Sequence, residues 1–243
     1  MRALLRWIGL CVIAFVALQL FFVARIALML VVHPESTTFQ RSAAWQMARE
    51  HGELRWRQQW VPYAQISDNL KRAVIASEDD NFVNHDGVEW EAIEKAWQKN
   101  AKSEELAARR ALQARPVKRP PKIVGGSTIS QQLAKNLFLS GERTLVRKGQ
   151  ELELTMLLEN MLGKRRILEI YLNSVEWGEG VFGAEAAAQH YYRKPASRLT
   201  AYEAARLAVM LPRPRYFERV PKSAYLSHRA SIIVARMADA ELP

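Results

Sequence analysis

Residues 151–173 read ELELTMLLENMLGKRRILEIYLN. The apolar side chains of this stretch recur three and four positions apart, a spacing that puts them on one face of an α-helix. They are Leu154, Leu157, Leu158 and Met161, followed by Ile167, Ile170 and Tyr171. From Ser67 onward, few segments alternate apolar and polar residues as strands do. The stretch therefore predicts a mainly α-helical domain.

Helical patterns continue on both sides of this stretch. Upstream, Ile129, Leu133 and Leu137 share one helical face. Downstream, residues 200–203 read TAYE, a capping box that predicts the start of another helix, and prolines at 212 and 214 end it. Residues 224–240 predict a closing helix. Between the helical regions, residues 101–122 are rich in charge, alanine and proline, which predicts a helical piece running into an exposed loop, flexible near 101–124.

The N-terminus carries an uncharged apolar run, WIGLCVIAFVALQLFFVA at residues 7–24, which continues apolar beyond Arg25. A bilayer core needs roughly 20 helical residues, and Arg25 can extend to the headgroups. A cleaved signal peptide is the alternative, but its apolar region spans only about 7–15 residues. The run therefore predicts a transmembrane anchor, and Arg2 and Arg6 ahead of it favour a cytoplasmic N-terminus.

The chain is thus expected to comprise a cytoplasmic N-terminus and anchor (1–33), a juxtamembrane segment (34–66) and a domain (67–243). The juxtamembrane segment carries Trp45, Trp56 and Trp60, which either pack on the domain or lie in the membrane interface. The 243 residues carry a formal net charge of +10, which indicates an anionic partner: nucleic acid, an anionic lipid surface or a phosphorylated substrate. The one cysteine, Cys11, lies in the apolar run, so the chain has no internal disulfide.

Glu78 is the first candidate for chemistry. It follows Leu70 and Val74 on one helical face and ends that helix beside Asp79 and Asp80. Partial burial, the helix dipole and the neighbouring carboxylates all raise the pKa of such a group. Glu78 is therefore either a general base or part of a surface acidic cluster.

Residues 125–132 read GGSTISQQ, two glycines followed by a cap and a helix. This arrangement leaves unpaired backbone N–H groups at a helix start, where an anion can bind. On the helix, Gln131 and Lys135, like Gln132 and Asn136, lie four positions apart and could hold hydroxyls and phosphate. The alternative is an ordinary capped helix.

Arg147 and Glu151 also lie four positions apart, on a face that continues as the apolar stripe of the opening stretch. They form either a surface salt bridge, which contributes little, or a carboxylate held beside buried surface by a cation. The sequence contains no HExxH, GxSxG, SxxK or KTG motif, and the absence of the last two excludes the acyl-serine chemistry of transpeptidases.

Four segments together resemble one known family. They are EDDNFVNHDG at 78–87, GGSTISQQLAKN at 125–136, RKGQE at 147–151 and KRRILEIYLN at 164–173. They are similar, in order, to the motifs E-D-x-x-F-x-x-H-x-G, G-G-S-T-I-x-Q-Q-x-x-K-N, R-K-x-x-E and K-x-x-I-L-E-x-Y-L-N of the peptidoglycan glycosyltransferases (family 51). The resemblance covers roughly residues 60–217 and is closest to the monofunctional form, which has no transpeptidase domain.

The resemblance implies a lysozyme-like helical fold and an enzyme that polymerises lipid II into β-1,4-linked glycan strands, releasing undecaprenyl diphosphate by inverting displacement. It implies that Glu78 is the general base and Glu151 the second carboxylate. The implied ligands of substrate and diphosphate are Lys135, Arg147, Gln132, Asn136, Ser127 and Lys148. Phe82, His85 and Gly87 are expected to shape the loop at Glu78, and residues 164–173 to pack beside the cleft. By analogy with inverting glycosidases, we expect the two carboxyl groups to lie about 6.5–9.5 Å apart or somewhat more.

The resemblance also implies the surroundings of the enzyme. The chain is expected in the bacterial inner (cytoplasmic) membrane, crossing it once, with the catalytic domain periplasmic. Its partners would be lipid II, the growing lipid-linked glycan chain, the membrane and other cell-wall synthesis and division proteins, and nucleic acid is not needed to explain the charge. No ligand cluster requires a metal, although a divalent cation (Mg or Mn) assists some relatives. The competing hypotheses are a glycan hydrolase of the same shape and a non-catalytic scaffold.

Overall fold

The computed structural model describes residues 1–112, 126–142 and 144–243, and helices make up most of these residues. The α-helices are α1 (Arg2–Leu28), α2 (Thr38–His51), α3 (Asp68–Glu78), α4 (Trp90–Leu112), α5 (Ile129–Phe138), α6 (Leu145–Ser174), α7 (Ala184–Tyr192), α8 (Ala201–Met210), α9 (Pro214–Arg219) and α10 (Ala224–Arg236). Short 3-10 turns are η1 (Tyr63–Gln65), η2 (Phe82–Asn84) and η3 (Ala196–Arg198). The predicted mainly α-helical class is confirmed, and the arrangement is consistent with a lysozyme-like domain.

A small sheet of three short strands accompanies the helices. The strands β1 (Arg57–Gln58), β2 (Glu176–Gly178) and β3 (Val181–Phe182) follow the order β1-β3-β2. The central strand β3 runs parallel to β1 and antiparallel to β2. Because β1 comes from the segment before the predicted domain, this pairing joins that segment to the body of the protein.

Helix packing builds the core of the body. Helix α8 packs against α3 and α10, and α5 packs against the long helix α6. The faces that meet are apolar: Leu70 and Val74 of α3, Leu133 of α5 and Leu154 and Leu158 of α6 are at most 1% exposed. Burial of such side chains is the main force that holds helices together. The spacing of apolar residues therefore predicted which helix faces are buried.

The helix boundaries follow the local signals in the sequence. The Thr128 and Thr200 side chains each form a capping box at the start of α5 and α8. Helix α8 ends at Met210, and Pro214 opens α9 at its first turn, where proline is tolerated. The closing helix ends at Arg236, four residues before the expected end. Helix α4 extends to Leu112, in agreement with the predicted helical piece, whereas the loop expected at 113–124 lies outside the described residues.

Helix α6 contains a break at Gly163. This glycine has φ 69° and ψ 158°, so the helix consists of two segments that meet there. Backbone angles in this region are essentially restricted to glycine. The first segment carries Glu151 and the second carries Tyr171, and α6 changes direction between them.

The segment 34–66, expected between anchor and domain, packs on the domain itself. The buried Gln40 amide donates to the Ser174 carbonyl at 2.9 Å, and Asn173 exchanges two hydrogen bonds with the Val61 backbone. The Trp56 ring lies 4.7 Å from the Phe182 ring, and Trp60 stacks on His33. Trp45 in contrast is 73% exposed. Two of the three tryptophans, Trp56 and Trp60, therefore pack against other side chains of the protein. This is the first of the two alternatives that the sequence left open.

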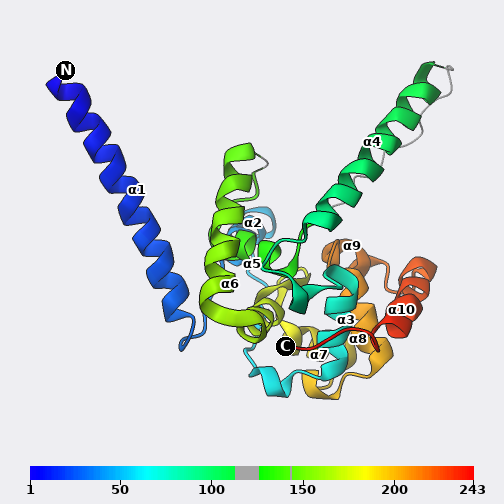
Figure 1. Ribbon diagram of the computed structural model, residues 1–243. Helices are drawn as coiled ribbons and strands as arrows, with labels where there is room; N and C mark the ends of the chain where they lie inside the picture. The colour runs from blue at the N-terminus through cyan, green and yellow to red at the C-terminus, as the bar shows by residue number, and fades with distance from the viewer. Residues whose placement is uncertain (113–125, 143) are drawn as a thin grey trace.

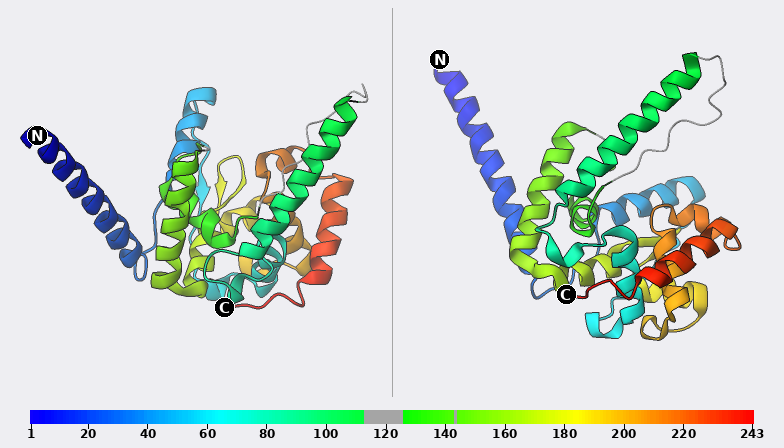
Figure 2. Two further views of the ribbon diagram at one scale, coloured as in Figure 1. Left: turned by 45° about the horizontal axis from the view of Figure 1, so that its top comes forward. Right: turned by 45° about the vertical axis from the view of Figure 1, so that its right-hand side comes forward.

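Helices α1 and α4 project away from the body (Figure 1), and the two further views in Figure 2 agree. In the described residues, α1 is the helix that is long and apolar enough to cross a membrane by length and composition. Its side chains are largely exposed except near its end, where Ile26 is fully buried. That end packs against α6. The helix expected as an anchor is thus present and is joined to the domain at its C-terminal end.

Candidate active site

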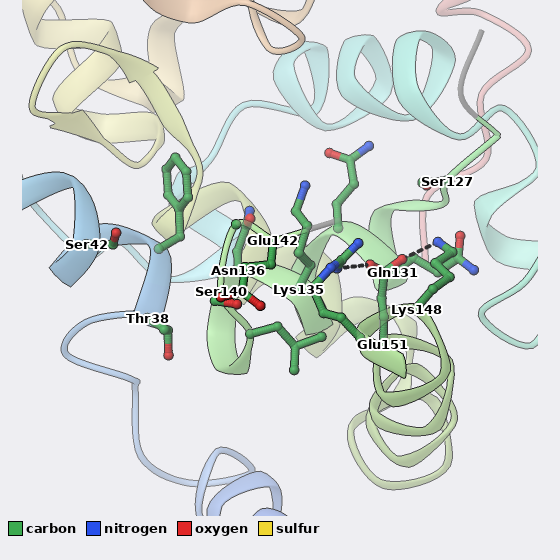
Figure 3. Close-up of a pocket in the computed structure, with 15 residues that line it drawn as sticks. Thr38, Ser42, Ser127, Gln131, Lys135, Asn136, Ser140, Glu142, Lys148 and Glu151 are labelled. Atoms are coloured by element: carbon green, nitrogen blue, oxygen red, sulfur yellow. Dashed lines mark hydrogen bonds and ion pairs between the residues drawn. The ribbon is translucent and has the colours of Figure 1, made fainter. Parts of the chain in front are cut away.

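A cavity of about 470 Å³ opens between α2, α5 and the start of α6. Figure 3 shows side chains from these three elements around the same space. Seven of the eight residues predicted for the site line it: Ser127, Gln132, Lys135, Asn136, Arg147, Lys148 and Glu151. The structure therefore brings together two of the sequence segments that were singled out, 125–136 and 147–151, and adds a wall from α2 that sequence reasoning did not identify.

Glu151 lies at the base of this cavity and is 3% exposed. Its Oε2 accepts a hydrogen bond from Arg147 Nη1 at 2.8 Å, and its Oε1 accepts one from Lys148 Nζ. Dashed lines in Figure 3 mark these ion pairs. Both partners lie on the same helical turn as Glu151, three and four positions before it, because Thr144 caps α6 and sets its start. The predicted pair is therefore a buried carboxylate that binds two cations, the largely buried Arg147 and the half-exposed Lys148.

Arg147 has a donor that this cluster leaves unused. Its Nε is buried and has no hydrogen-bond partner among the described residues. A buried donor without a partner costs about 1–3 kcal/mol, and Arg147 lines the cavity. A ligand with an anionic oxygen could remove that cost by accepting this hydrogen bond, and a guanidinium can hold phosphate through two parallel bonds.

Glu78 is the predicted residue that does not line the cavity, but one hydrogen bond connects it to the cavity wall. The Gln132 Nε2 donates to Glu78 Oε2 at 3.0 Å, and Gln132 does line the cavity. Burial is the main reason that the pKa of Glu78 is raised, and the nearby Asp79 charge raises it further. The Gln132 and Ser77 hydrogen bonds and the Lys135 charge act in the opposite direction without cancelling the effect. The predicted direction is confirmed, and a carboxylate with a raised pKa is a better proton acceptor.

Asp79 and Asp80 differ in their surroundings. Asp79 is buried and lies next to Glu78 within the site, whereas Asp80 is exposed and pairs with Arg236 of α10. Of the three consecutive acidic residues at the end of α3, only Asp80 is therefore exposed at the surface.

The start of α5 does not offer the free anion site that its glycines and cap suggested. Asp79 Oδ2 accepts a hydrogen bond from the Ile129 N–H at 2.9 Å. The Thr128 hydroxyl accepts from the Gln131 N–H, and the Gln131 side chain accepts in return from the Thr128 N–H. A carboxylate of the protein occupies the place predicted for a ligand, because the helix start favours a negative charge of any origin. Of the two alternatives that the sequence left open here, the ordinary capped helix is the one observed, and Gln131 acts as a cap.

The loop after Glu78 is held as expected by His85 and Gly87. His85 Nε2 lies 2.9 Å from Asp79 Oδ1, and the Gly87 N–H donates to His85 Nδ1. Since Nδ1 accepts that bond, Nε2 carries the proton and donates to Asp79. The Thr128 hydroxyl donates to the Gly87 carbonyl at 2.6 Å. These contacts fix the end of α3, and with it Glu78, against the start of α5.

Tyr171 is a residue of the site that sequence reasoning placed only in the packing. It is fully buried in α6, and its hydroxyl donates to Gln132 Oε1 at 2.9 Å. The one signal for this role was a hydroxyl on an otherwise apolar helix face. Thr38 and Ser42 of α2 also line the cavity, and nothing in their local sequence connects them to residues almost 100 positions away.

Metal binding was left open by the sequence. In the described parts of the chain, no group of three or more His, Cys, Asp or Glu side chains gathers in the way a metal ion requires. The assisting divalent cation stays a prediction.

Comparison with known proteins gives a consistent result. The sequence profile described as Transglycosylase matches residues 46–238. A biosynthetic peptidoglycan transglycosylase of Burkholderia thailandensis is 52% identical over 246 residues, which cover 100% of this chain and 90% of the relative. Proteins of the same name from Burkholderia cenocepacia (54% identical, 95% of this chain and 87% of the relative) and Paraburkholderia xenovorans (53%, 95% and 90%) are similar. With its motifs gathered around one cavity and a family profile that spans most of its length, the chain belongs to the transglycosylase family.

Proposed function

We propose that this protein is a peptidoglycan glycosyltransferase that polymerises lipid II into β-1,4-linked glycan strands and releases undecaprenyl diphosphate. The observation that carries the proposal is that one site combines a cationic cavity with a carboxylate whose pKa is raised. A cavity lined by Lys135, Arg147 and Lys148 lies one hydrogen bond away from Glu78, whose pKa is raised. The names of the relatives support the substrate class.

In the proposed reaction, Glu78 accepts the proton of the acceptor sugar's 4-hydroxyl as that oxygen attacks the anomeric carbon of the donor. The new bond joins this oxygen to the anomeric carbon, and the bond between that carbon and the diphosphate oxygen breaks. The electron pair leaves with the diphosphate. Because the donor is α-linked and the product is β-linked, one displacement inverts the anomeric centre.

The cationic side of the cavity would stabilise the leaving diphosphate. Arg147 offers its unpaired buried Nε, and Lys135 and Lys148 add positive charge. Charges fixed in advance around developing negative charge are often the largest contribution to catalysis. Glu151 would act mainly by orienting Arg147 and Lys148, since both of its oxygens accept hydrogen bonds from them. Ser127, Gln132 and Asn136 are placed to contact sugar or diphosphate oxygens.

A glycan hydrolase is a weaker proposal because it does not explain the cationic residues that line the cavity. Its substrate carries no diphosphate at the bond that is cleaved, so the three cations that line the cavity would have no role in binding it. A non-catalytic scaffold would likewise leave the raised pKa of Glu78 without a purpose.

The membrane anchor places this chemistry at the surface where the lipid tails of donor and acceptor lie. We propose that α1 crosses the bacterial inner membrane once and that the domain lies in the periplasm. A fusion of alkaline phosphatase to Pro243 tests this topology, since the phosphatase folds to an active form only outside the cytoplasm. An active fusion is the expected result, and an inactive phosphatase with an active cytoplasmic reporter at the same position would contradict it.

The polymerisation itself is tested with labelled lipid II and the full-length protein in detergent. The wild-type protein is expected to form polymer, and Glu78→Gln is expected to reduce the rate by about 100-fold or more, as loss of a general base does. Asp80→Asn is the matched control, because it removes the exposed carboxylate two positions further along the same acidic run. Activity in Glu78→Gln equal to that of the control would exclude the proposed mechanism.

A further inference from the structure

Two hydrogen bonds connect the second segment of helix α6 to Glu78 through a single amide. The Tyr171 hydroxyl donates to Gln132 Oε1 at 2.9 Å, and Gln132 Nε2 donates to Glu78 Oε2 at 3.0 Å. Tyr171 is fully buried, and the residues around it on α6 form the core. The hydroxyl is therefore held in place by packing, and the amide it contacts faces the carboxylate proposed as the base.

An amide has one accepting and one donating end, so its orientation matters to Glu78. With Nε2 toward Glu78, the amide stabilises the ionised carboxylate. With the amide reversed, Oε1 would face Glu78 and could form a hydrogen bond only with the protonated carboxyl. The Tyr171 hydroxyl would then lose its acceptor inside the core, which costs free energy. Tyr171 thus favours the orientation that supports the charged form.

The other groups that face Glu78 are two charges of fixed sign and one hydroxyl. On its own helix, the Ser77 hydroxyl donates to it and the Asp79 charge repels it, while Lys135 of α5 attracts it. Asp79 is fixed by its hydrogen bonds to His85 and to the Ile129 N–H. Reversal of the Gln132 amide would change the sign of its effect on Glu78, and this amide is held by a hydrogen bond from the core residue Tyr171.

We propose that Tyr171 is a positioning residue that fixes the Gln132 amide so that its N–H, and not its carbonyl, faces Glu78. This keeps Glu78 ionised and ready to accept a proton at pH values where its burial would otherwise leave it protonated. The inference rests on the proposed function of Glu78 as general base, and it gives one tyrosine of the segment 164–173 a role beyond packing.

The first test is the dependence of kcat/KM on pH for Tyr171→Phe, with labelled lipid II as substrate. Without the hydroxyl the amide is free to reverse, and the acidic limb of the profile is expected to move up by about one pH unit. Activity below the limb then falls about tenfold while activity on the alkaline side is retained. Tyr63→Phe is the matched control: Tyr63 is also largely buried, and its hydroxyl contacts the Pro243 carbonyl instead of the Gln132 amide. The acidic limb of the Tyr63→Phe profile should lie at the same pH as that of the wild type.

A second variant separates this role from general damage to the fold. Gln132→Leu removes the donor itself, so its acidic limb should also move up, even if lost substrate contacts lower its activity at every pH. In the double variant the two shifts should not add, because both act through one amide. If Tyr171→Phe does not fold, 3-fluorotyrosine at position 171 keeps the shape with a stronger donor, and the limb should move to lower pH.

The outcomes distinguish this inference from the proposed function. An inactive Glu78→Gln variant together with an unshifted limb in Tyr171→Phe would overturn the inference alone. A loss of equal size at all pH values in Tyr171→Phe, or additive shifts in the double variant, would assign Tyr171 a structural role and also overturn it. Full activity in Glu78→Gln would instead remove the general base on which the inference rests.

Discussion

Glu78 and Glu151 are two carboxylates of one site with opposite surroundings. Both oxygens of Glu151 pair with cations, and its side chain is almost fully buried. Removing Arg147, the largely buried partner, should cost about 3–5 kcal/mol, as is typical of a buried ion pair. Burial and the neighbouring Asp79 charge favour the protonated form of Glu78 and raise its pKa, although an amide and a hydroxyl donate hydrogen bonds to it that act in the opposite direction. The different surroundings support different roles, one carboxylate for holding cations and one for moving a proton.

The raised pKa of Glu78 has a consequence for stability that can be measured. A carboxyl group whose pKa is higher in the folded state contributes stability below its unfolded pKa, and this is lost as pH rises through the folded pKa. At neutral pH the ionised, half-buried Glu78 therefore destabilises the fold. Glu78→Gln should melt at a higher temperature than the wild type at pH 7.5, and the difference should vanish near pH 4. A variant less stable than the wild type at pH 7.5 in thermal melts followed by circular dichroism would contradict this.

At the scale of elements, the break in α6 decides how the site is assembled. A continuous helix would carry Glu151 and Tyr171 along one straight axis, 20 residues apart. The second segment, which follows the break at Gly163, places the Tyr171 hydroxyl against Gln132 of α5. Because of this one glycine, α6 can contribute Glu151 to the cavity and also contact, through Tyr171, the amide that binds the proposed base.

Two glycines of α6 provide a matched test of this break. An added Cβ would meet no atom within 4 Å at either Gly163 or Gly149, so packing does not distinguish them. Gly163 has a backbone conformation that alanine avoids, and Gly163→Ala should destabilise the protein by about 1–3 kcal/mol. Gly149 lies in regular helix, and Gly149→Ala should stabilise it by about 0.5–1 kcal/mol. Chemical denaturation of the two variants measures both changes, and equal signs would contradict the assignment.

At the scale of the whole molecule, Arg166 fixes the anchor to the domain. Its Nε donates to the Met29 carbonyl at 2.8 Å and its Nη2 to the Val32 carbonyl at 3.2 Å, just beyond the end of α1. Its Nη1 donates to Glu169 on its own helix, which keeps the guanidinium in place. A cation at a helix C-terminus is favoured by the helix dipole as well. The direction of the anchor relative to the cavity is therefore set by a specific contact and not by a flexible linker.

Loss of this contact should loosen the anchor. Spin labels on Cys11, in α1, and on Glu153→Cys, exposed on α6, report the distance between anchor and domain. In Arg166→Leu the distribution of distances should broaden, whereas the neighbouring and exposed Arg165→Leu should leave it unchanged. Pulsed electron paramagnetic resonance on protein in lipid nanodiscs measures both. An unchanged distribution in Arg166→Leu would show that packing of Ile26 and Met29 suffices.

The sequence by itself determined what local spacing controls. It predicted the helices, the caps at Thr128 and Thr200, the apolar anchor, and the pairing of Arg147 with Glu151, because residues three or four positions apart on a helix are neighbours whatever the rest of the chain does. It also predicted the direction of the pKa shift of Glu78, since burial and a neighbouring charge could both be seen locally. These interactions need only a helix to form.

Only the tertiary structure decided which distant groups meet. Asp79 occupies the start of α5, 50 positions away, and so removes the anion site predicted there. The Gln132 amide joins Tyr171 to Glu78 across separations of 39 and 54 positions. Such contacts depend on how helices pack, and packing is directed by the total apolar surface that is buried, which no local pattern encodes. The helices of this protein are therefore set by its local sequence, and the protonation of its proposed base by its packing.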